Sequence, residues 1–484
     1  MKNSINSGGQ NMPFIIGITL IATLGGLLFG YDTAVISGAE KSVQAYLIDS
    51  LGLSSWVHGA TISSALIGCI IGAAFSGVLA SGLGRKKSLI LAATLFFFSA
   101  LGSAYPEFLF FERGEPTLGL LYMFNFYRII GGIGVGLASA VVPIFIGELA
   151  PANIRGRLVS LNQFAIIFGM LVVYFVNWDI ANGQTVEWIN EVGWRRMFLS
   201  EALPAGLFGI LLFFVPETPR YLSLINKDDE ALKVLTKVNG ADKAKSILLE
   251  IKSSIGHHSG KLLSYGKTVI VIGVLLSVFQ QFVGINVALY YAPRIFESMG
   301  AAKDASMLQT VVMGIVNVLF TVLAIFTVDK WGRKPLLMVG SIGMAVGMFA
   351  LSALSYFSVL GTGTLIFIIV YTASFMMSWG PICWVLISEI FPNKIRGKAV
   401  AVAVVAQWTA NYVVSSVSLP MMEFNSDITY GFFGFMSIIS FFFVWKMIPE
   451  TKGKTLEELE SLWTKDSDNT PKSSNSTKIE NVNF

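Results

Sequence analysis

The chain has 484 residues, of which 54% are hydrophobic and only 13% are charged, and its mean hydropathy is +0.67. Soluble domains carry about 25% charged residues, so this composition excludes an ordinary soluble protein and predicts a polytopic membrane protein. The net charge of +4 does not indicate nucleic-acid binding, because the basic residues are concentrated in particular loops.

Twelve apolar runs follow one another along the chain. A helix needs about 20 mostly apolar residues to cross a bilayer, and the runs are of about that length. The sequence lacks the alternating pattern of a membrane barrel strand. We therefore predict an all-α membrane protein with twelve transmembrane helices, at roughly 13–36, 57–80, 88–104, 119–146, 157–178, 197–215, 267–292, 306–328, 335–358, 363–388, 398–420 and 428–448.

Basic residues gather in alternate loops between these runs. The clusters are Arg85, Lys86 and Lys87; Arg155 and Arg157; Lys330, Arg333 and Lys334; and Lys394, Arg396 and Lys398. Loops rich in Lys and Arg stay on the cytoplasmic side of a membrane. The pattern therefore predicts that these loops and both termini are cytoplasmic. The first apolar run is too long for the hydrophobic region of a cleavable signal peptide.

The segment 217–266 interrupts the apolar pattern with charged, helix-forming sequence. We interpret it as a cytoplasmic helical linker between two six-helix halves. The predicted domains are an N-terminal cytoplasmic tail (1–12), an N-terminal half (13–216), the linker (217–266), a C-terminal half (267–448) and a C-terminal cytoplasmic tail (449–484). The polar stretch from Lys465 onward is predicted to be disordered.

Three motifs occur twice, once in each half. "GRKKS" at Gly84 matches "GRKPL" at Gly332, "ELAPANIRGR" at Glu148 matches "EIFPNKIRGK" at Glu389, and "PETPRYL" at Pro216 matches "PETKGKTLEEL" at Pro449. The order and spacing repeat as well. A parallel repeat of two six-helix halves is typical of transporters, whose substrate site lies near mid-membrane between the halves.

The charged residues of these motifs suggest a gate at the cytoplasmic face. Acidic and basic side chains at this depth can pair with each other and with helix ends. Such a network would hold the halves together there and separate when the site opens inward. The alternative is that the charges only fix the topology, but their duplication favours gating. The candidate gating residues are Arg85, Glu148, Arg155, Glu217, Asp329, Arg333, Glu389, Arg396 and Glu450.

The chain resembles the major facilitator superfamily and, within it, the sugar porter family. The motifs "GRKP", "PETPR", "QQFVGIN" and "PETKGKTLEEL" and the two Arg-Gly motifs are signatures of that family, and the resemblance covers residues from about 13 to 462. One position departs from the pattern. Ser81 and Gly82 stand where the family has an acidic and a basic residue, whereas the second half keeps Asp329 and Lys330.

Amide and indole side chains occur near the middle of several predicted spans. Amides both donate and accept hydrogen bonds and aromatic faces pack on sugar rings, so this set favours a neutral sugar as ligand. The alternative is that the amides only join helices. The resemblance implies sugar contacts at the same positions and adds an aromatic wall of Phe29, Tyr290 and Trp408. The candidate sugar-binding residues are Phe29, Gln163, Gln280, Gln281, Asn286, Tyr290, Asn317, Gly380, Trp384, Gln407 and Trp408.

Asp32 is the only charged residue in the apolar run 14–36. Arg128 in the fourth predicted span and Glu201 in the sixth lie at a similar depth, so we expect the three to meet. An unpaired charge at the bilayer centre costs about 2.5–3.5 kcal/mol on insertion scales. The group is either a structural ion pair or a proton switch. In the sugar porter family an acid at this position accompanies proton symport, which favours the second interpretation.

No cofactor or metal site is predicted. Cys69 and Cys383 lie in apolar runs of opposite halves, and the three histidines lie outside the centres of the spans. The glycine run "GGIGVG" from Gly131 is inside an apolar span, so it indicates close helix packing and not nucleotide binding. The sequence also lacks a nucleophile–base pair, and we do not expect an enzyme.

The expected function is a sugar:H⁺ symporter of the bacterial inner membrane that imports a monosaccharide, with D-xylose as the leading substrate. Its expected partners are a small neutral sugar, a proton and membrane lipid, without nucleic acid, and it is expected to be a monomer. The alternatives are a facilitative or proton-coupled porter for glucose, galactose, arabinose or inositol. A membrane sugar sensor is disfavoured because the C-terminal tail is short.

Overall fold

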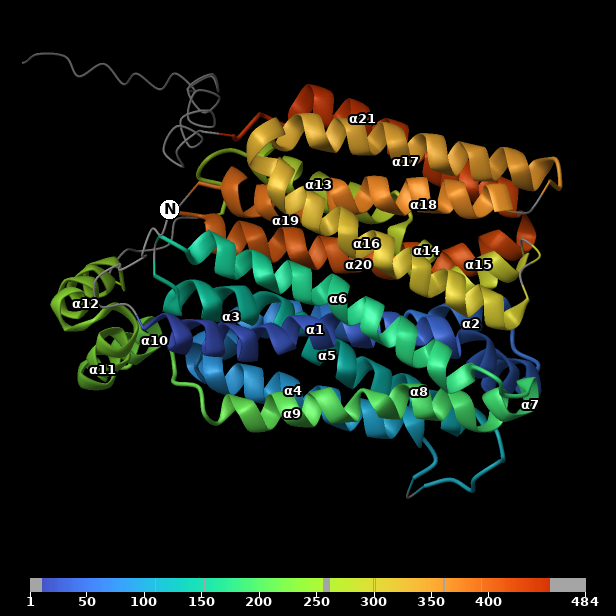
Figure 1. Ribbon diagram of the computed structural model, residues 1–484, viewed down its shortest axis with the longest axis horizontal. Helices are drawn as coiled ribbons and strands as arrows, with labels where there is room; N and C mark the ends of the chain where they lie inside the picture. Colours follow the sequence, from blue (N-terminus) through green and yellow to red (C-terminus); the bar gives the residue numbers. More distant parts are fainter. Residues whose placement is uncertain are drawn as a thin grey trace, which may run out of the picture.

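The computed structural model describes residues 11–452, except 109, 152, 256–261, 299, 301, 360–361 and 393. In this part of the chain every regular element is a helix. Figure 1 shows two helical bundles side by side, the N-terminal half in blue to green and the C-terminal half in yellow to red. The predicted C-terminal disorder falls outside the described residues.

The N-terminal half contains the first six membrane crossings. Its helices are α1 (Met12–Val43), α2 (Ser55–Ile62) with α3 (Ser64–Gly82), α4 (Arg85–Ala104), α5 (Leu118–Leu149), α6 (Arg155–Ala181), the short α7 (Val186–Trp188), α8 (Trp194–Ser200) and α9 (Ala202–Leu212). Short π and 3₁₀ turns, η1 (Gln44–Ile48), η2 (Asp49–Leu51) and η3 (Ile189–Gly193), extend this half beyond α1 and before α8.

The C-terminal half repeats the arrangement after a linker of three short helices. The linker contains α10 (Pro219–Leu224), α11 (Asp228–Asn239) and α12 (Ala241–Ile255). The half itself contains α13 (Thr268–Phe282), α14 (Ile285–Tyr290), α15 (Ala292–Ser298), α16 (Lys303–Trp331), α17 (Arg333–Tyr356), α18 (Thr362–Met377), α19 (Trp379–Ile390), α20 (Arg396–Phe424) and α21 (Ser426–Met447).

Eleven helical stretches of the described chain are long and apolar enough to span a membrane. The predicted span at 197–215 is not among them because a turn at Glu201 divides it into α8 and α9, and each piece is short. The two pieces follow one another along the edge of the N-terminal half (Figure 1). The all-α membrane fold is confirmed, with a break in its sixth crossing that hydropathy did not reveal.

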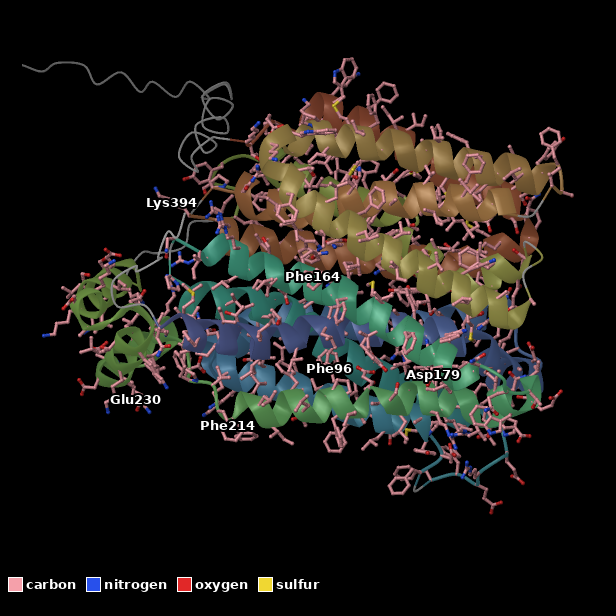
Figure 2. The ribbon with its side chains drawn as sticks, in the orientation of Figure 1. Phe96, Phe164, Asp179, Phe214, Glu230 and Lys394 are labelled. Atoms are coloured by element: carbon pink, nitrogen blue, oxygen red, sulfur yellow. The ribbon has the colours of Figure 1, made fainter. Side chains whose placement is uncertain are left out.

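The two ends of the bundle differ. We call the end that carries α10–α12 the linker end and the opposite end, which carries α7, the far end (Figure 1). In Figure 2, Glu230 and Lys394 lie at the linker end, whereas Asp179 lies toward the far end and Phe96 and Phe164 lie between them. The outward faces between the ends are apolar, as expected for contact with lipid; Leu203, for example, is 82% exposed.

Glycines bring the helices of the N-terminal half into close contact. A Cβ atom at Gly132 of α5 would lie 1.8 Å from the Ala65 carbonyl oxygen of α3, and one at Gly136 would lie 2.4 Å from that of Cys69. Small residues allow such approach between membrane helices. The glycine run from Gly131 therefore packs α5 against α3. Cys69 and Cys383 are buried and free.

Candidate functional site

Asp32 and Arg128 form a buried ion pair in the N-terminal half. Arg128 on α5 donates from Nη1 to Asp32 Oδ1 at 2.7 Å and from Nη2 to the Asp32 carbonyl oxygen at 3.2 Å. The two side chains are only 2% and 1% exposed. The guanidinium also lies over the Phe198 ring, 5.3 Å from its centre. Each of these two charges thus has its partner inside the protein.

Glu201 joins this pair from the break between α8 and α9. It is fully buried and close enough to Asp32 and Arg128 for their charges to act on it. Tyr31 directly precedes Asp32 in α1, and its hydroxyl lies 2.7 Å from the Ser200 hydroxyl, which joins α1 to α8. The three residues expected to meet at one depth do meet. The described contacts pair Arg128 with Asp32, whereas both carboxylate oxygens of Glu201 are buried without a hydrogen-bond partner among the described residues.

A chain of amides lies in the C-terminal half where its helices are broken. Gln280 accepts hydrogen bonds from Gln281 at 3.1 Å and from Gln407 at 2.6 Å, and Asn286 donates to Gln281 at 2.5 Å. Gln280 itself donates to the carbonyl oxygens of Trp379 and Gly380, at 2.9 and 3.3 Å. Four of the predicted residues with side-chain amides are therefore linked to one another and to predicted Gly380.

The helix breaks explain why these amides can meet. Gly284 has a φ of +90°, a conformation that favours glycine, and it separates α13 from α14. A second break at Ser378 separates α18 from α19. It comes two residues before Gly380, one of the candidate sugar-binding residues. Broken helices expose backbone carbonyls at mid-membrane, where transporters bind their substrates.

Aromatic residues of the two halves meet beside the amides. Phe29 of α1 and Trp408 of α20 have ring centres 5.6 Å apart. Within the described residues, the buried Gln407 Oε1, Trp408 Nε1 and Tyr290 hydroxyl have no hydrogen-bond partner, and neither does Asn317 Oδ1. Buried polar atoms without a partner are rare in folded proteins and call for a physical explanation.

Three predicted residues are not joined to this network. Among the residues that the structure describes, no hydrogen bond links Gln163, Asn317 or Trp384 to the four amides. Asn317 is buried on α16, whereas Gln163 on α6 and Trp384 on α19 are partly buried.

The repeated motifs form matching ion pairs at the linker end. Arg85 donates to Glu148 at 2.8 Å in the N-terminal half, and Arg333 donates to Glu389 at 3.1 Å in the C-terminal half. Arg155 and Arg396 each donate to the carbonyl oxygen five residues before them, on Ala150 and on Phe391. Each of these contacts stays within one half, and the expected link between the halves when the site faces outward stays a prediction.

The glutamates of the Pro-Glu-Thr motifs cap helices. Glu217 accepts from the backbone N–H of Lys86 at 3.1 Å, and Glu450 accepts from those of Arg333 and Lys334 at 3.1 and 3.0 Å. These N–H groups belong to the first turns of α4 and α17, where helices leave donors unpaired. The side chain of Asp329 lies outside what the structure describes.

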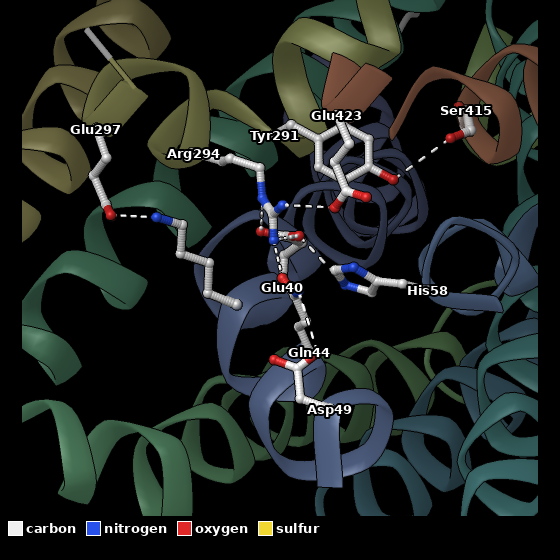
Figure 3. Close-up of polar contacts among 10 residues, drawn as sticks. Glu40, Gln44, Asp49, His58, Tyr291, Arg294, Glu297, Ser415 and Glu423 are labelled. Atoms are coloured by element: carbon white, nitrogen blue, oxygen red, sulfur yellow. Dashed lines mark hydrogen bonds and ion pairs between the residues drawn. The ribbon is translucent and has the colours of Figure 1, made fainter. Parts of the chain in front are cut away.

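Sequence reasoning missed a polar cluster at the far end, which Figure 3 shows. Glu40 of α1 lies against His58 of α2 and Arg294 of α15, and Lys41 pairs with Glu297. His58 is fully buried, although its place near a span end did not suggest it. The only available signal was a charge just beyond the end of an apolar run, as in "GAEKS" and "APRIFES".

Comparison with known proteins identifies the family. The model of the sugar (and other) transporter family matches residues 18–463, which is nearly the whole described chain. The chain belongs to this family. The resemblance drawn from its motifs is therefore confirmed, and so is the prediction of a multi-pass sugar transporter.

Several transporters resemble the chain over almost their whole length. A D-xylose-proton symporter of Escherichia coli (strain K12) is 52% identical over 474 residues, covering 94% of this chain and 96% of its own. An arabinose-proton symporter of Bacillus subtilis is 40% identical, with the same coverage. A glucose facilitated diffusion protein of Zymomonas mobilis is 36% identical, covering 94% and 99%.

Solved structures agree with the fold in detail. The inward-open conformation of the xylose transporter XylE from E. coli matches with a TM-score of 0.85 at 52% identity, covering 93% of this chain and all of that one. The same transporter bound to 6-bromo-6-deoxy-D-glucose matches with a TM-score of 0.81, covering 94% and 100%.

Proposed function

We propose that this protein is a proton-coupled monosaccharide importer that carries D-xylose by alternating access. The buried, unpartnered polar atoms beside the linked amides carry the proposal. Gln407 Oε1 is an acceptor and Trp408 Nε1 is a donor, while the Tyr290 hydroxyl is both. Sugar hydroxyls are donors and acceptors as well, so a bound sugar would satisfy atoms that the described protein leaves unpaired.

The ring contact between Phe29 and Trp408 supports a sugar at the same place. It joins α1 of one half to α20 of the other, so a sugar packed on these rings would touch both halves. A ligand can shift a conformational equilibrium only through different contacts in the two states. Binding between the halves supplies such a difference because those contacts change when the halves move.

The Asp32, Arg128 and Glu201 group would carry the proton. If both carboxyls were ionised, the buried group would have a net negative charge, which is costly in an apolar environment. One proton on a carboxyl removes that charge. In a conformation that admits water the proton can leave, so loading and release would follow the side to which the group is open. The identity of the E. coli relative as a D-xylose-proton symporter supports this coupling.

The charge pattern sets the proposed orientation. The linker end carries the loops rich in Lys and Arg and would be cytoplasmic, with both termini, in a bacterial inner membrane. At the far end the two halves are joined by polar contacts such as Ser63 Oγ to Ser416 Oγ at 2.5 Å. The described arrangement therefore fits a transporter whose site is shut toward the outside, and we propose that it acts as a monomer.

Uptake by purified protein in sealed vesicles tests the proposal. We expect D-xylose uptake to alkalinise the outer medium, and Asp32→Asn to abolish accumulation against a gradient while sugar exchange continues. Glu107→Gln is the matched control, because Glu107 is also a buried acid paired with an arginine, Arg195 at 2.9 Å, but away from the interface between the halves. Full accumulation by Asp32→Asn would exclude the proton role, and vesicles that move no monosaccharide would exclude the function.

The alternative is a porter that equilibrates glucose, galactose, arabinose or inositol, with or without protons. It is favoured by the 36% identity to a glucose facilitated diffusion protein. Counterflow with a panel of labelled sugars would identify the substrate. A sugar that is taken up without any change in external pH would favour the facilitative mechanism.

A further inference from the structure

Two pairs of opposite charges connect the halves at the far end (Figure 3). Glu40 and Lys41 are neighbours at the end of α1 in the N-terminal half, and Arg294 and Glu297 lie on α15 in the C-terminal half. Arg294 pairs with Glu40 at 2.7 Å, and Lys41 pairs with Glu297. Both pairs therefore cross the boundary at which the halves would separate.

The order of the charged residues on α1 and α15 allows only one alignment of these two helices. The residues on α1 run negative then positive, and those on α15 run positive then negative. Residues three apart lie on one face of a helix, so Arg294 and Glu297 can both face α1. Exchanging the partners would set like charges against each other, which is strongly unfavourable across an interface.

The inner pair is buried and well supported. Arg294 binds both carboxylate oxygens of Glu40, with Nε 3.2 Å from Oε2, and also donates to Gln44. His58 Nε2 lies 3.3 Å from the same carboxylate, and Glu423 lies 3.6 Å from the guanidinium. Glu40 is only 1% exposed. Removing one partner of a buried pair leaves the other charge unpaired, so these two residues hold each other in place only while the end is shut.

The outer pair is more accessible. Lys41 and Glu297 are 37% and 23% exposed, so they can return to water when they separate. An exposed pair contributes little to stability by itself. It lies beside the buried pair (Figure 3). The partners of a pair within one rigid half would not separate into water in this way, because they do not move apart during transport.

We propose that the Glu40–Arg294 and Lys41–Glu297 pairs are a latch that holds the far end shut and sets how often it opens. This inference rests on the proposed alternating-access function. In that mechanism both pairs separate whenever the site opens at the far end and form again whenever it opens at the linker end.

A cysteine beneath the latch reports opening without any sugar. Ser63 is fully buried and lies against Ser416 of the other half. We would introduce Ser63→Cys and measure its labelling by a membrane-impermeant maleimide applied from the far side, in the full-length protein in vesicles. The background from Cys69 and Cys383 is measured on the same protein without Ser63→Cys.

Charge reversal of the outer pair is the principal test, because its exposure makes misfolding less of a concern. Lys41→Glu sets two carboxylates together and should speed labelling about tenfold, the effect of roughly 1.4 kcal/mol on the opening equilibrium. The double variant Lys41→Glu with Glu297→Lys should return the rate to within about twofold of the parent. For the inner pair, Glu40→Gln should also speed labelling.

Asp228→Lys provides a matched control, because Asp228 pairs with Lys252 at 2.5 Å within the linker and does not join the halves. It should leave labelling unchanged. The latch is excluded if Lys41→Glu labels at the parental rate, or if the double variant labels as fast as the single one. Labelling that responds as expected in a protein that moves no sugar would leave the latch standing and exclude the proposed function.

Discussion

At position 30 of α1 only a hydrogen atom fits as a side chain. A Cβ atom on Gly30 would lie 1.9 Å from the carbonyl oxygen of Ile166 and 3.1 Å from the Met170 nitrogen, both in the backbone of α6. Backbone atoms of a packed helix cannot move aside as a flexible side chain can. The contact between α1 and α6 therefore depends on this glycine, which lies two residues before Asp32 and next to Phe29.

We expect Gly30→Ala to lower the thermal unfolding temperature and the yield of folded protein. Forcing extra volume into a packed interior costs about 1–3 kcal/mol, which here exceeds the gain in helix propensity from alanine. Gly17→Ala is the control in the same helix, because a Cβ there would meet nothing within 4 Å. Thermal unfolding in detergent would compare the two. Equal unfolding temperatures would mean that α1 and α6 can separate at Gly30 without penalty.

Some site residues were predictable and others were not. Asp32 stands out because it is the only charge in a long apolar run, and the depth of Arg128 along its own span identified its partner. Glu40 gave no comparable signal. Its partner Arg294 is in the other half, and only the way the halves meet brings the two together. The unpaired atoms of Gln407 and Trp408 likewise became visible only in three dimensions.

Helix α4 begins with a cap from a residue far along the chain. Gly84, with a φ of +97°, turns the chain into α4, and Glu217 accepts from the Lys86 N–H in its first turn. We expect Glu217→Ala to lower the free energy of unfolding by about 1 kcal/mol, as for other lost caps. In a thermal melt this would be a decrease on the order of 2 °C. Unchanged stability would show that water replaces the cap fully.

The ionisation of Glu217 should also make the stability of the folded protein depend on pH. Burial raises the pKa of Glu217 above its usual 4.5, although backbone N–H donors and Arg85 lower it in part. The folded protein then binds the Glu217 proton more tightly than the unfolded chain does. The stabilisation of the folded state by this proton is therefore complete below pH 4.5, and it is lost as the pH rises through the pKa of Glu217 in the folded protein. Glu217→Gln cannot titrate. The unfolding temperature of the parent minus that of Glu217→Gln should therefore fall with rising pH. A rising difference would contradict the burial argument.

Hydropathy predicted which segments are helices but not where they end or break. The run 13–36 continues as helix to Val43 because the polar residues of its last turns face protein, including the buried Glu40. The sixth crossing divides at Glu201, where a fully buried acid faces Asp32 and Arg128. In both places tertiary contacts determine the local structure, and a pattern of apolar residues carries no information about them.

The repeat has consequences for the motion of the whole molecule. Arg85 with Glu148 and Arg333 with Glu389 tie each half together at the linker end, while the latch ties one half to the other at the far end. Two bodies that are internally braced and joined along one boundary move most easily by rocking. When the two halves separate at one end of the molecule, they must then approach each other at the opposite end.

Distances measured at both ends of the molecule would test this coupling. Spin labels on exposed Ser81→Cys and Lys446→Cys would report the linker ends of the two halves, and labels on exposed Gln184→Cys and Tyr356→Cys would report the far ends. During a titration with D-xylose, or on reversing the charge of Lys41, we expect the two distances to change in opposite directions. Labels on Lys227 and Lys252 within the linker serve as the control and should not follow that opposition. If both ends lengthened together, the halves would not rock as rigid bodies, and a local gate would have to admit the sugar instead.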